Sequence, residues 1–310
     1  MAAPPCAAHR LPKNSVFQQP VKLGICLLLL VVAARADDQA RTIMTEVYHV
    51  NHFLSVKNLA YGNRRHPLQV ADLPPQGKPR VVRLERHLNN DYPPDHHLRG
   101  RDLVIFRSGK LRGTGILVDL PRDPARPLSF AVWLPALRKI RRHAEPDQGD
   151  TWAGGIFTYG DMYLRRPDDE THQLLEETTF EGCLGTAGRP LPGAPEASCH
   201  PRGRPVWKIR STTRFPNWWY DHRIVLVDRE TFADYRSTYY KNGQAVKVID
   251  KDWRSMGLAD PRAQYWRYFW GRRLDTGQEG IAWIDPEGVR WNQKVDPAFW
   301  SLATLRRLRR

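Results

Sequence analysis

The feature that most constrains this chain is a regular succession of short segments, apolar or alternating, separated by glycine, proline and aspartate. These segments cover residues 81–86, 102–106, 115–118, 130–134, 138–142, 172–180, 206–213, 222–228, 235–241, 245–253, 265–273 and 280–284. Segments of this length that recur with turn residues between them are typical of antiparallel sheets. The sequence therefore predicts an all-β chain with minor helices, arranged as a meander.

The strongest single turn signal is Asn242-Gly243, which lies between two of these segments. A two-residue type I′ hairpin needs positive φ at both central positions, and Asn-Gly meets that need. We therefore predict a tight hairpin here. Two stretches do not have strand character: residues 147–166, interpreted as a lid, and the Pro/Gly-rich residues 185–205, interpreted as a surface excursion.

A helix is predicted near the start of the mature chain, over residues 40–54. Ile43, Val47, Val50 and Leu54 recur there at helical spacing. A helix of this kind needs an apolar surface to cover.

The N-terminus carries the signals of export. Lys22 precedes an apolar run over residues 23–34, which closes with Ala34-Arg35-Ala36. The run is shorter than the ~20 residues of a spanning helix, and a small-x-small cleavage site follows it. We predict a signal peptide over residues 1–36, cleaved after Ala36, and a periplasmic location. The mature residues 37–310 are expected to form a single domain, since one all-β domain often reaches about 250 residues.

The charge of the chain is strongly positive. The net charge is +15, and the leader contributes Arg10, Lys13, Lys22 and Arg35 with no acidic residue, so residues 37–310 carry 15 − 4 = +11. An exported protein meets anionic lipid head groups, so we predict no nucleic-acid partner. A solvated basic surface that keeps the protein soluble is the alternative.

Only Cys183 and Cys199 remain in the mature chain. An oxidising compartment permits a disulfide that closes the loop between them. Two free thiols are the alternative interpretation.

Motifs that would indicate an enzyme or a metal centre do not occur. The sequence contains no H-E-x-x-H, no G-x-S-x-G and no C-x-x-C pattern. We therefore predict no catalytic activity, no metal and no cofactor. The chain does contain eleven tryptophans, which suit the lining of a concave apolar site. For any single tryptophan, ordinary core packing is the alternative.

Six motifs, taken in order, resemble the LolA-like family of outer-membrane lipoprotein-sorting proteins, from about Arg80 to the C-terminus. They are Arg112–Leu117, Trp133–Arg142, Trp152 with Phe157–Tyr159 and Asp161-Met162, Val227–Phe232, Tyr239-Tyr240 with Gly243 and Lys247, and Asp296–Ser301 with Leu305. The resemblance implies an incomplete antiparallel β-barrel with a helical lid, whose apolar concave face shields acyl chains across the periplasm.

The resemblance and the aromatic residues together give candidate site residues. We assign ligand binding to Trp133, Leu134, Trp152, Phe157, Tyr159, Trp207 and Trp266, and contact with a head group or partner to Arg112, Arg138 and Arg141. The expected cargo is a lipid or lipoprotein acyl chain. An inner-membrane exporter and an outer-membrane acceptor are the expected partners.

The sequence departs from the family pattern at three places. Gly154–Phe157 and Gly160 stand where the family has Gly-Ser-Asp-Phe and an acidic residue. Residues 185–205 are inserted, and residues before Arg80 have no clear counterpart. These departures put the ligand contacts in doubt and leave a second hypothesis open: a non-carrying interaction subunit of an envelope exporter or assembly complex, with a filled groove.

Overall fold

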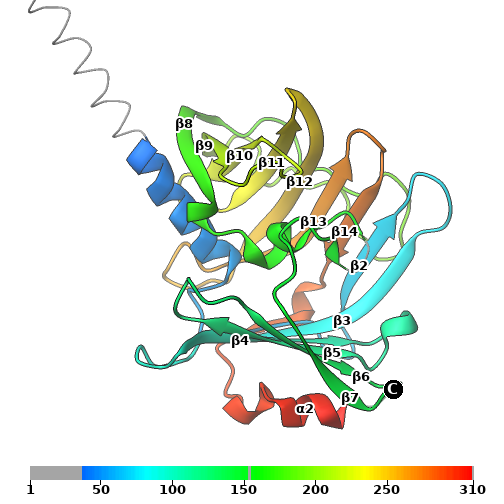
Figure 1. Ribbon diagram of the computed structural model, residues 1–310. Helices are drawn as coiled ribbons and strands as arrows, with labels where there is room; N and C mark the ends of the chain where they lie inside the picture. Colours follow the sequence, from blue (N-terminus) through cyan, green and yellow to red (C-terminus); the bar gives the residue numbers. More distant parts are fainter. Residues whose placement is uncertain (1–36, 153–154, 309–310) are drawn as a thin grey trace, which may run out of the picture.

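The computed structural model describes residues 37–152 and 155–308 (Figure 1). The predicted signal peptide lies outside these residues. Among the described helices, none is both long enough and apolar enough to cross a bilayer.

In the described residues, fifteen antiparallel strands form one sheet. The strands are β1 (Asn58–Tyr61), β2 (Leu68–Leu73), β3 (Arg80–Asn89), β4 (Leu98–Phe106), β5 (Gly115–Pro121), β6 (Ser129–Leu134), β7 (Lys139–His143), β8 (Glu170–Thr179), β9 (Pro205–Thr213), β10 (His222–Asp228), β11 (Asp234–Lys241), β12 (Gln244–Ser255), β13 (Gln264–Arg273), β14 (Glu279–Trp283) and β15 (Val289–Trp291). Residues 37–51 are helical, and α2 covers Leu302–Arg307. Short helical turns lie at Gly109–Leu111, Gly160–Leu164, Pro167–Asp169, Pro286–Gly288 and Pro297–Phe299.

Two meanders build the sheet. Strands β2 to β7 follow one another in space, as do β8 to β14, and β2 pairs with β14 with Ala71 opposite Ile281. β7 and β8 are the two outer edges and do not pair with each other, so the barrel is incomplete. All twelve predicted strands are present, and the predicted fold class is confirmed. β1, β2 and β15 were not predicted.

The curved sheet has a concave face and an outer face (Figure 1). The helix of residues 37–51 and the segment that leads into β8 lie on the concave side, whereas α2 lies beneath β4 to β7 on the outer side. Ile43, Val47 and Val50 are buried as predicted. The helix ends at residue 51 rather than 54, and Phe53 (φ 55°) occupies the buried position beyond it in place of the half-buried Leu54.

The predicted hairpin at Asn242-Gly243 is confirmed. The two residues have φ values of 49° and 75°, and Lys241 pairs with Gln244 on either side of them. The turn therefore fixes the register between β11 and β12.

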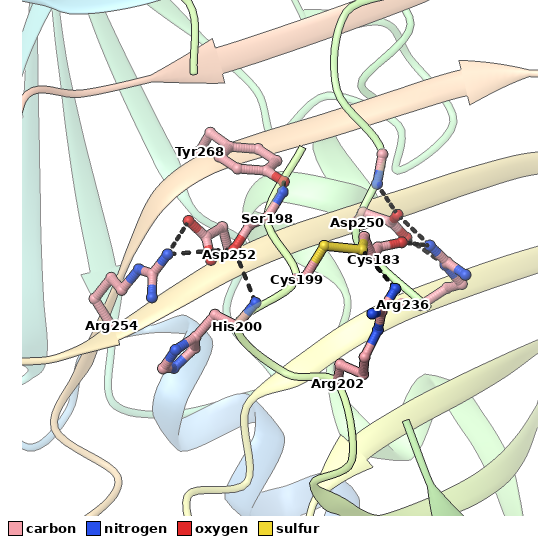
Figure 2. Close-up of a disulfide and its surroundings, with 11 residues drawn as sticks. Cys183, Ser198, Cys199, His200, Arg202, Arg236, Asp250, Asp252, Arg254 and Tyr268 are labelled. Atoms are coloured by element: carbon pink, nitrogen blue, oxygen red, sulfur yellow. Dashed lines mark hydrogen bonds and ion pairs between the residues drawn. A yellow bond between two sulfur atoms is a disulfide. The ribbon is translucent and has the colours of Figure 1, made fainter. Parts of the chain in front are cut away.

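The disulfide between Cys183 and Cys199 is also confirmed (Figure 2). The loop that it closes packs on the outer face of the sheet. The Gly185 amide donates to Asp250 at 2.6 Å, and Ser198 Oγ donates to Asp252 at 2.9 Å. A Cβ at Gly185 would lie 2.3 Å from the Trp270 ring, so the loop is seated closely on β13.

Candidate functional site

The floor of the concave face is aromatic at its centre. Tyr61 stacks on Trp266 with ring centroids 4.6 Å apart, and Phe53 lies 5.5 Å from Tyr61. The Tyr61 hydroxyl accepts from the Trp266 amide at 2.8 Å. These rings belong to the main buried cluster, together with Trp253 and Phe269. The centre of the sheet thus offers a broad apolar surface.

An inner segment (residues 148–152 and 155–164) covers this floor. The Trp152 amide donates to the Phe157 carbonyl at 2.7 Å, and Phe157 stacks on Phe269 at 4.4 Å between centroids. Ile156 and Phe157 lie directly over Gly271 and Gly280. A Cβ at Gly271 would lie 2.9 Å from Ile156, and one at Gly280 would lie 3.0 Å from it. The inner segment therefore packs directly on the sheet backbone at these two glycines.

A buried ion pair fixes the inner segment to β12. Lys247 Nζ donates to Asp161 at 2.5 Å and to the Ile156 carbonyl at 2.7 Å. Arg165 and the Tyr239 hydroxyl also donate to Asp161, at 3.3 and 3.0 Å. Burial alone would raise the pKa of Asp161, but Lys247 and Arg165 hold it well below its ordinary value. Asp161 is therefore a carboxylate in the folded protein.

Gly160 occupies a position without room for a side chain. A Cβ at this position would lie 2.9 Å from the Gln148 carbonyl oxygen, and the Gly160 amide donates to that oxygen at 2.8 Å. An acidic residue would disrupt this contact. The absence of a side chain at Gly160 thus lets the inner segment pack closely against Gln148.

The helix of residues 37–51 is held by a second polar contact. Lys251 Nζ donates to Asp234 at 2.7 Å and to Asn51 Oδ1 at 2.5 Å, and Asn51 donates to Asp234 at 2.9 Å. Burial lowers the pKa of Lys251, and Asp234 opposes this shift. The apolar side of the helix packs on β9 and β10, where Ile209, Val225 and Val227 are buried.

A third ionic group lies where β8 and β10 face the helix. Arg223 donates to Glu170 at 2.7 Å, and the Tyr220 hydroxyl donates to the same carboxylate at 2.8 Å. Burial alone would raise the pKa of Glu170, but Arg223 lowers it to about 2. Arg165 lies over the rings of Tyr220 and Tyr239, at 5.5 and 5.4 Å. This half of the concave face is therefore charged, whereas the other half is apolar.

Little space remains between these layers. A cavity of about 60 Å³ lies among Tyr48, Asp161, Arg165, Arg223 and Lys251. Ligand pockets usually hold about 300–1,000 Å³, so this cavity has room for water molecules but not for an acyl chain. In the described residues, no group of three His, Cys, Asp or Glu side chains is placed to hold a metal ion.

A larger cleft of about 400 Å³ lies outside this cavity and shares Tyr48, Tyr163, Arg166 and Pro167 with it. The helix of residues 37–51 forms one side of the cleft, and the end of β5 with Leu128 forms the other. Arg99 and Arg122 also line the cleft. The cleft is thus a basic mouth that opens beside the small cavity.

The structure brings only some of the predicted ligand residues together. Trp152, Phe157 and Trp266 belong to the main buried cluster, and Tyr159 packs at its margin against Phe130. Trp207 packs instead with the helix of residues 37–51 and Phe232.

Two other predicted ligand residues lie on β6, and Trp133 lies away from the concave floor. Trp133 packs with Trp300 and Leu305 on the outer face, where α2 covers it. Leu134 is half-buried at the end of β6. The prediction of one common groove is therefore corrected for Trp133, because alternation along β6 directs its side chain to the opposite face.

The three arginines predicted to contact a head group or partner are all exposed. Arg112 precedes β5, Arg138 lies in the turn between β6 and β7 with φ 48°, and Arg141 lies on the edge strand β7. The prediction did not include the buried ionic residues. Lys247, Ile249, Lys251 and Trp253 lie at every second position of β12 and therefore on one face of the strand. Two lysines on an otherwise apolar, inward face were the sequence signal for these buried ionic residues.

Comparisons with known proteins give the fold but no curated relative. A family model described as "Uncharacterized protein" matches residues 99–307, and no curated protein matches the chain. A DUF1329 family protein from Desulfovibrio piger is 14% identical, with a TM-score of 0.63, and the match covers 87% of this chain and 99% of that one.

Two further solved structures have the same architecture. A putative outer membrane lipoprotein-sorting protein domain from Vibrio parahaemolyticus is 13% identical, with a TM-score of 0.62, over 87% of this chain and all (100%) of that one. A LolA superfamily protein from Nitrosomonas europaea is 12% identical, with a TM-score of 0.52, over 86% and 98%. At these identities the likeness concerns the fold.

Proposed function

We propose that this chain, which belongs to the family whose model matches residues 99–307 and has a LolA-like fold, is a periplasmic carrier for the acyl chain of a lipid or lipoprotein. The observation that carries the proposal is the inner segment. Ile156 and Phe157 form an apolar cover over an aromatic floor and rest on Gly271 and Gly280. An acyl chain that displaced this cover would meet the same apolar surface.

In this proposal the described conformation is the unloaded, closed state. Each methylene removed from water contributes roughly 0.8 kcal/mol, so a twelve-carbon chain contributes roughly 10 kcal/mol. That gain is large enough to offset the separation of Lys247 from Asp161 and the exposure of Ile156 and Phe157. The basic mouth with Arg99 and Arg122 would hold the anionic head group while the chain enters.

Trp152, Phe157 and Trp266 are the residues that we propose to contact the chain, with Tyr159 at the margin. The predicted partners, an inner-membrane exporter that loads the carrier and an outer-membrane acceptor that unloads it, belong to the same proposal. No catalytic step is part of it.

One observation favours a second candidate function. The concave face is filled by the chain itself, and the cavity that remains there measures about 60 Å³. A protein that never opens would present a permanently covered groove. It would then act as a non-carrying subunit of an envelope exporter or assembly complex.

Native mass spectrometry with lipid extraction distinguishes the two functions. The mature chain, Asp37 to Arg310, is purified from the periplasm without detergent. A stoichiometric acyl-bearing species would support the carrier. An apo mass, together with no uptake of fatty acid afterwards, would refute it and favour the interaction subunit.

Tryptophan quenching locates the bound chain. Brominated fatty acids quench tryptophans that they contact, so uptake should quench the parent protein and quench the Trp266→Phe variant less. A Trp207→Phe variant is the matched control, because Trp207 lies in the other cluster. Equal quenching of the parent and Trp266→Phe would place the chain elsewhere.

A further inference from the structure

A second hollow, separate from the concave face, lies on the outer face beside α2. Its volume is about 840 Å³. Its arginines come from the loop before β2, from β3, from the residues between β4 and β5, and from α2: Arg64, Arg65, Arg83, Arg107, Arg112 and Arg307. No acidic residue is among the described residues that line it. We call it the arginine groove.

Most of these arginines have no acidic partner among the described residues. Arg107 forms two hydrogen bonds to Glu85, both at 2.7 Å. Among the described residues, the other five guanidinium groups have no ion-pair or hydrogen-bond partner. Elsewhere on the sheet, Arg86, Arg223 and Arg236 are each paired with a buried carboxylate. Five uncompensated cations in one hollow repel each other, so an anionic ligand would stabilise them.

Exposed apolar side chains lie near the groove at one end of the sheet. β5 begins where β6 ends and β7 begins, because Gly115 pairs with Trp133 and Trp133 pairs with Ile140. Leu111 is 37% exposed just before β5, and Leu137 is 53% exposed in the turn before β7. Each leucine has a lysine or arginine beside it in the sequence, as in Lys110-Leu111-Arg112.

From these observations we propose that the arginine groove binds the phosphate groups of anionic phospholipid head groups at a bilayer surface. Guanidinium groups bind phosphate through paired hydrogen bonds. The exposed leucines enter the region between head groups and acyl chains, as in other peripheral proteins that combine cations with a few apolar side chains. The leucines favour a lipid surface over a free anion, which would leave them in water.

This inference does not depend on acyl-chain transport. The groove lies on the outer face, whereas the proposed acyl site lies on the concave face. A protein that fails to take up fatty acid could still dock on a membrane, and a protein that does not dock on a membrane could still take up fatty acid. The two proposals can therefore be tested on the same sample and fail separately.

The test is flotation of the mature protein with vesicles of phosphatidylcholine alone or with added phosphatidylglycerol. We expect binding only to the anionic vesicles, with loss at high salt. The triple variant Arg64→Ser/Arg83→Ser/Arg112→Ser should bind on the order of 100-fold more weakly. The matched control is Lys57→Ser/Arg126→Ser/Lys294→Ser, which removes three exposed charges at the opposite end of the sheet.

Three results would overturn the proposal. The first is that the groove variant binds the vesicles as tightly as the parent does. The second is that the groove variant and the control lose the same affinity. The third is that inorganic phosphate, at a concentration equal to that of the lipid phosphate, displaces the protein from the vesicles. The variant Leu111→Ser/Leu137→Ser should also bind more weakly. If its binding were unchanged, the arginines alone would account for vesicle binding, and the role given to the leucines would be wrong. All substituted side chains are exposed, so circular dichroism should show an unchanged fold.

Discussion

Lys247 Nζ donates to the carboxylate of Asp161 at 2.5 Å, with 4% of the lysine side chain and none (0%) of the aspartate side chain exposed. This pair joins the middle of the sheet to the segment that covers it. A buried ion pair adds little net stability compared with an apolar pair, but removal of one partner leaves an uncompensated charge. Any opening of the inner segment therefore has to separate this pair.

Replacement of one partner should loosen the inner segment. We expect Lys247→Met to lower the free energy of unfolding by about 3 kcal/mol, because Asp161 stays buried without its closest cation. Chemical denaturation measures this change. The double variant Lys247→Met/Asp161→Asn should lose less than the sum of the two single variants, with a coupling of about 1–3 kcal/mol. Additive losses would show that the pair does not act as a unit.

Acid should destabilise the protein through Glu170. The pKa of this carboxyl is about 2 in the folded protein and 4.5 ordinarily, so the unfolded chain binds the proton more tightly. The stabilisation is complete above pH 4.5 and is lost as the pH falls toward 2. Between pH 6 and pH 3, Glu170 should account for about 2 kcal/mol of the loss. The variant Glu170→Gln should show a correspondingly smaller loss in denaturation at the two pH values, and an unchanged loss would contradict the assignment.

A side chain can be introduced at Gly271, where the inner segment packs on the sheet. An added Cβ at Gly271 would lie 2.9 Å from Ile156 and 3.0 Å from Phe157, so Gly271→Ala should displace the segment. We expect a loss of about 1–3 kcal/mol, as for other overpacked cores, and faster hydrogen exchange at the Thr158 amide, which is bonded to Asp161.

A compensating change tests the steric cause. In the Ile156→Ala background, Gly271→Ala should lose less stability, because most of the Ile156 side chain that the new Cβ would contact has been removed. If Gly271→Ala also takes up fatty acid faster than the parent, the inner segment is the barrier to loading. An equal loss in both backgrounds would exclude contact with Ile156 as the cause.

The strands were predictable because their signals are local. The alternation in residues 245–253 and the Asn242-Gly243 turn specify β12 and its hairpin without reference to the rest of the chain. β1 and β15 have only four and three residues, so neither presents a readable pattern. The pairing of β2 with β14 joins residues about 210 positions apart, and no local pattern carries that information.

The site was harder to predict because it depends on the face of the sheet on which each side chain lies and on partners that are distant in the sequence. Trp133 and Trp266 look alike in sequence, yet one is covered by α2 and the other lies on the concave floor. The partners of Asp161 come from 3 to 86 positions away. Alternation along β12 places Lys247 and Lys251 on the inward face, but only the structure identifies their carboxylate partners, Asp161 and Asp234.

The disulfide should stabilise the fold without affecting the concave face. Cys183 and Cys199 are 16 positions apart, and closure of a loop of this length contributes about 3 kcal/mol in the chain-entropy model. Their loop bonds to Asp250 and Asp252, whose side chains point to the outer face (Figure 2). The variant Cys183→Ser/Cys199→Ser should therefore unfold at a lower denaturant concentration and still take up fatty acid at the parent rate. If uptake changed as well, strain in the outer loop would have to reach the inner segment through β12, and the two faces of the sheet would be coupled.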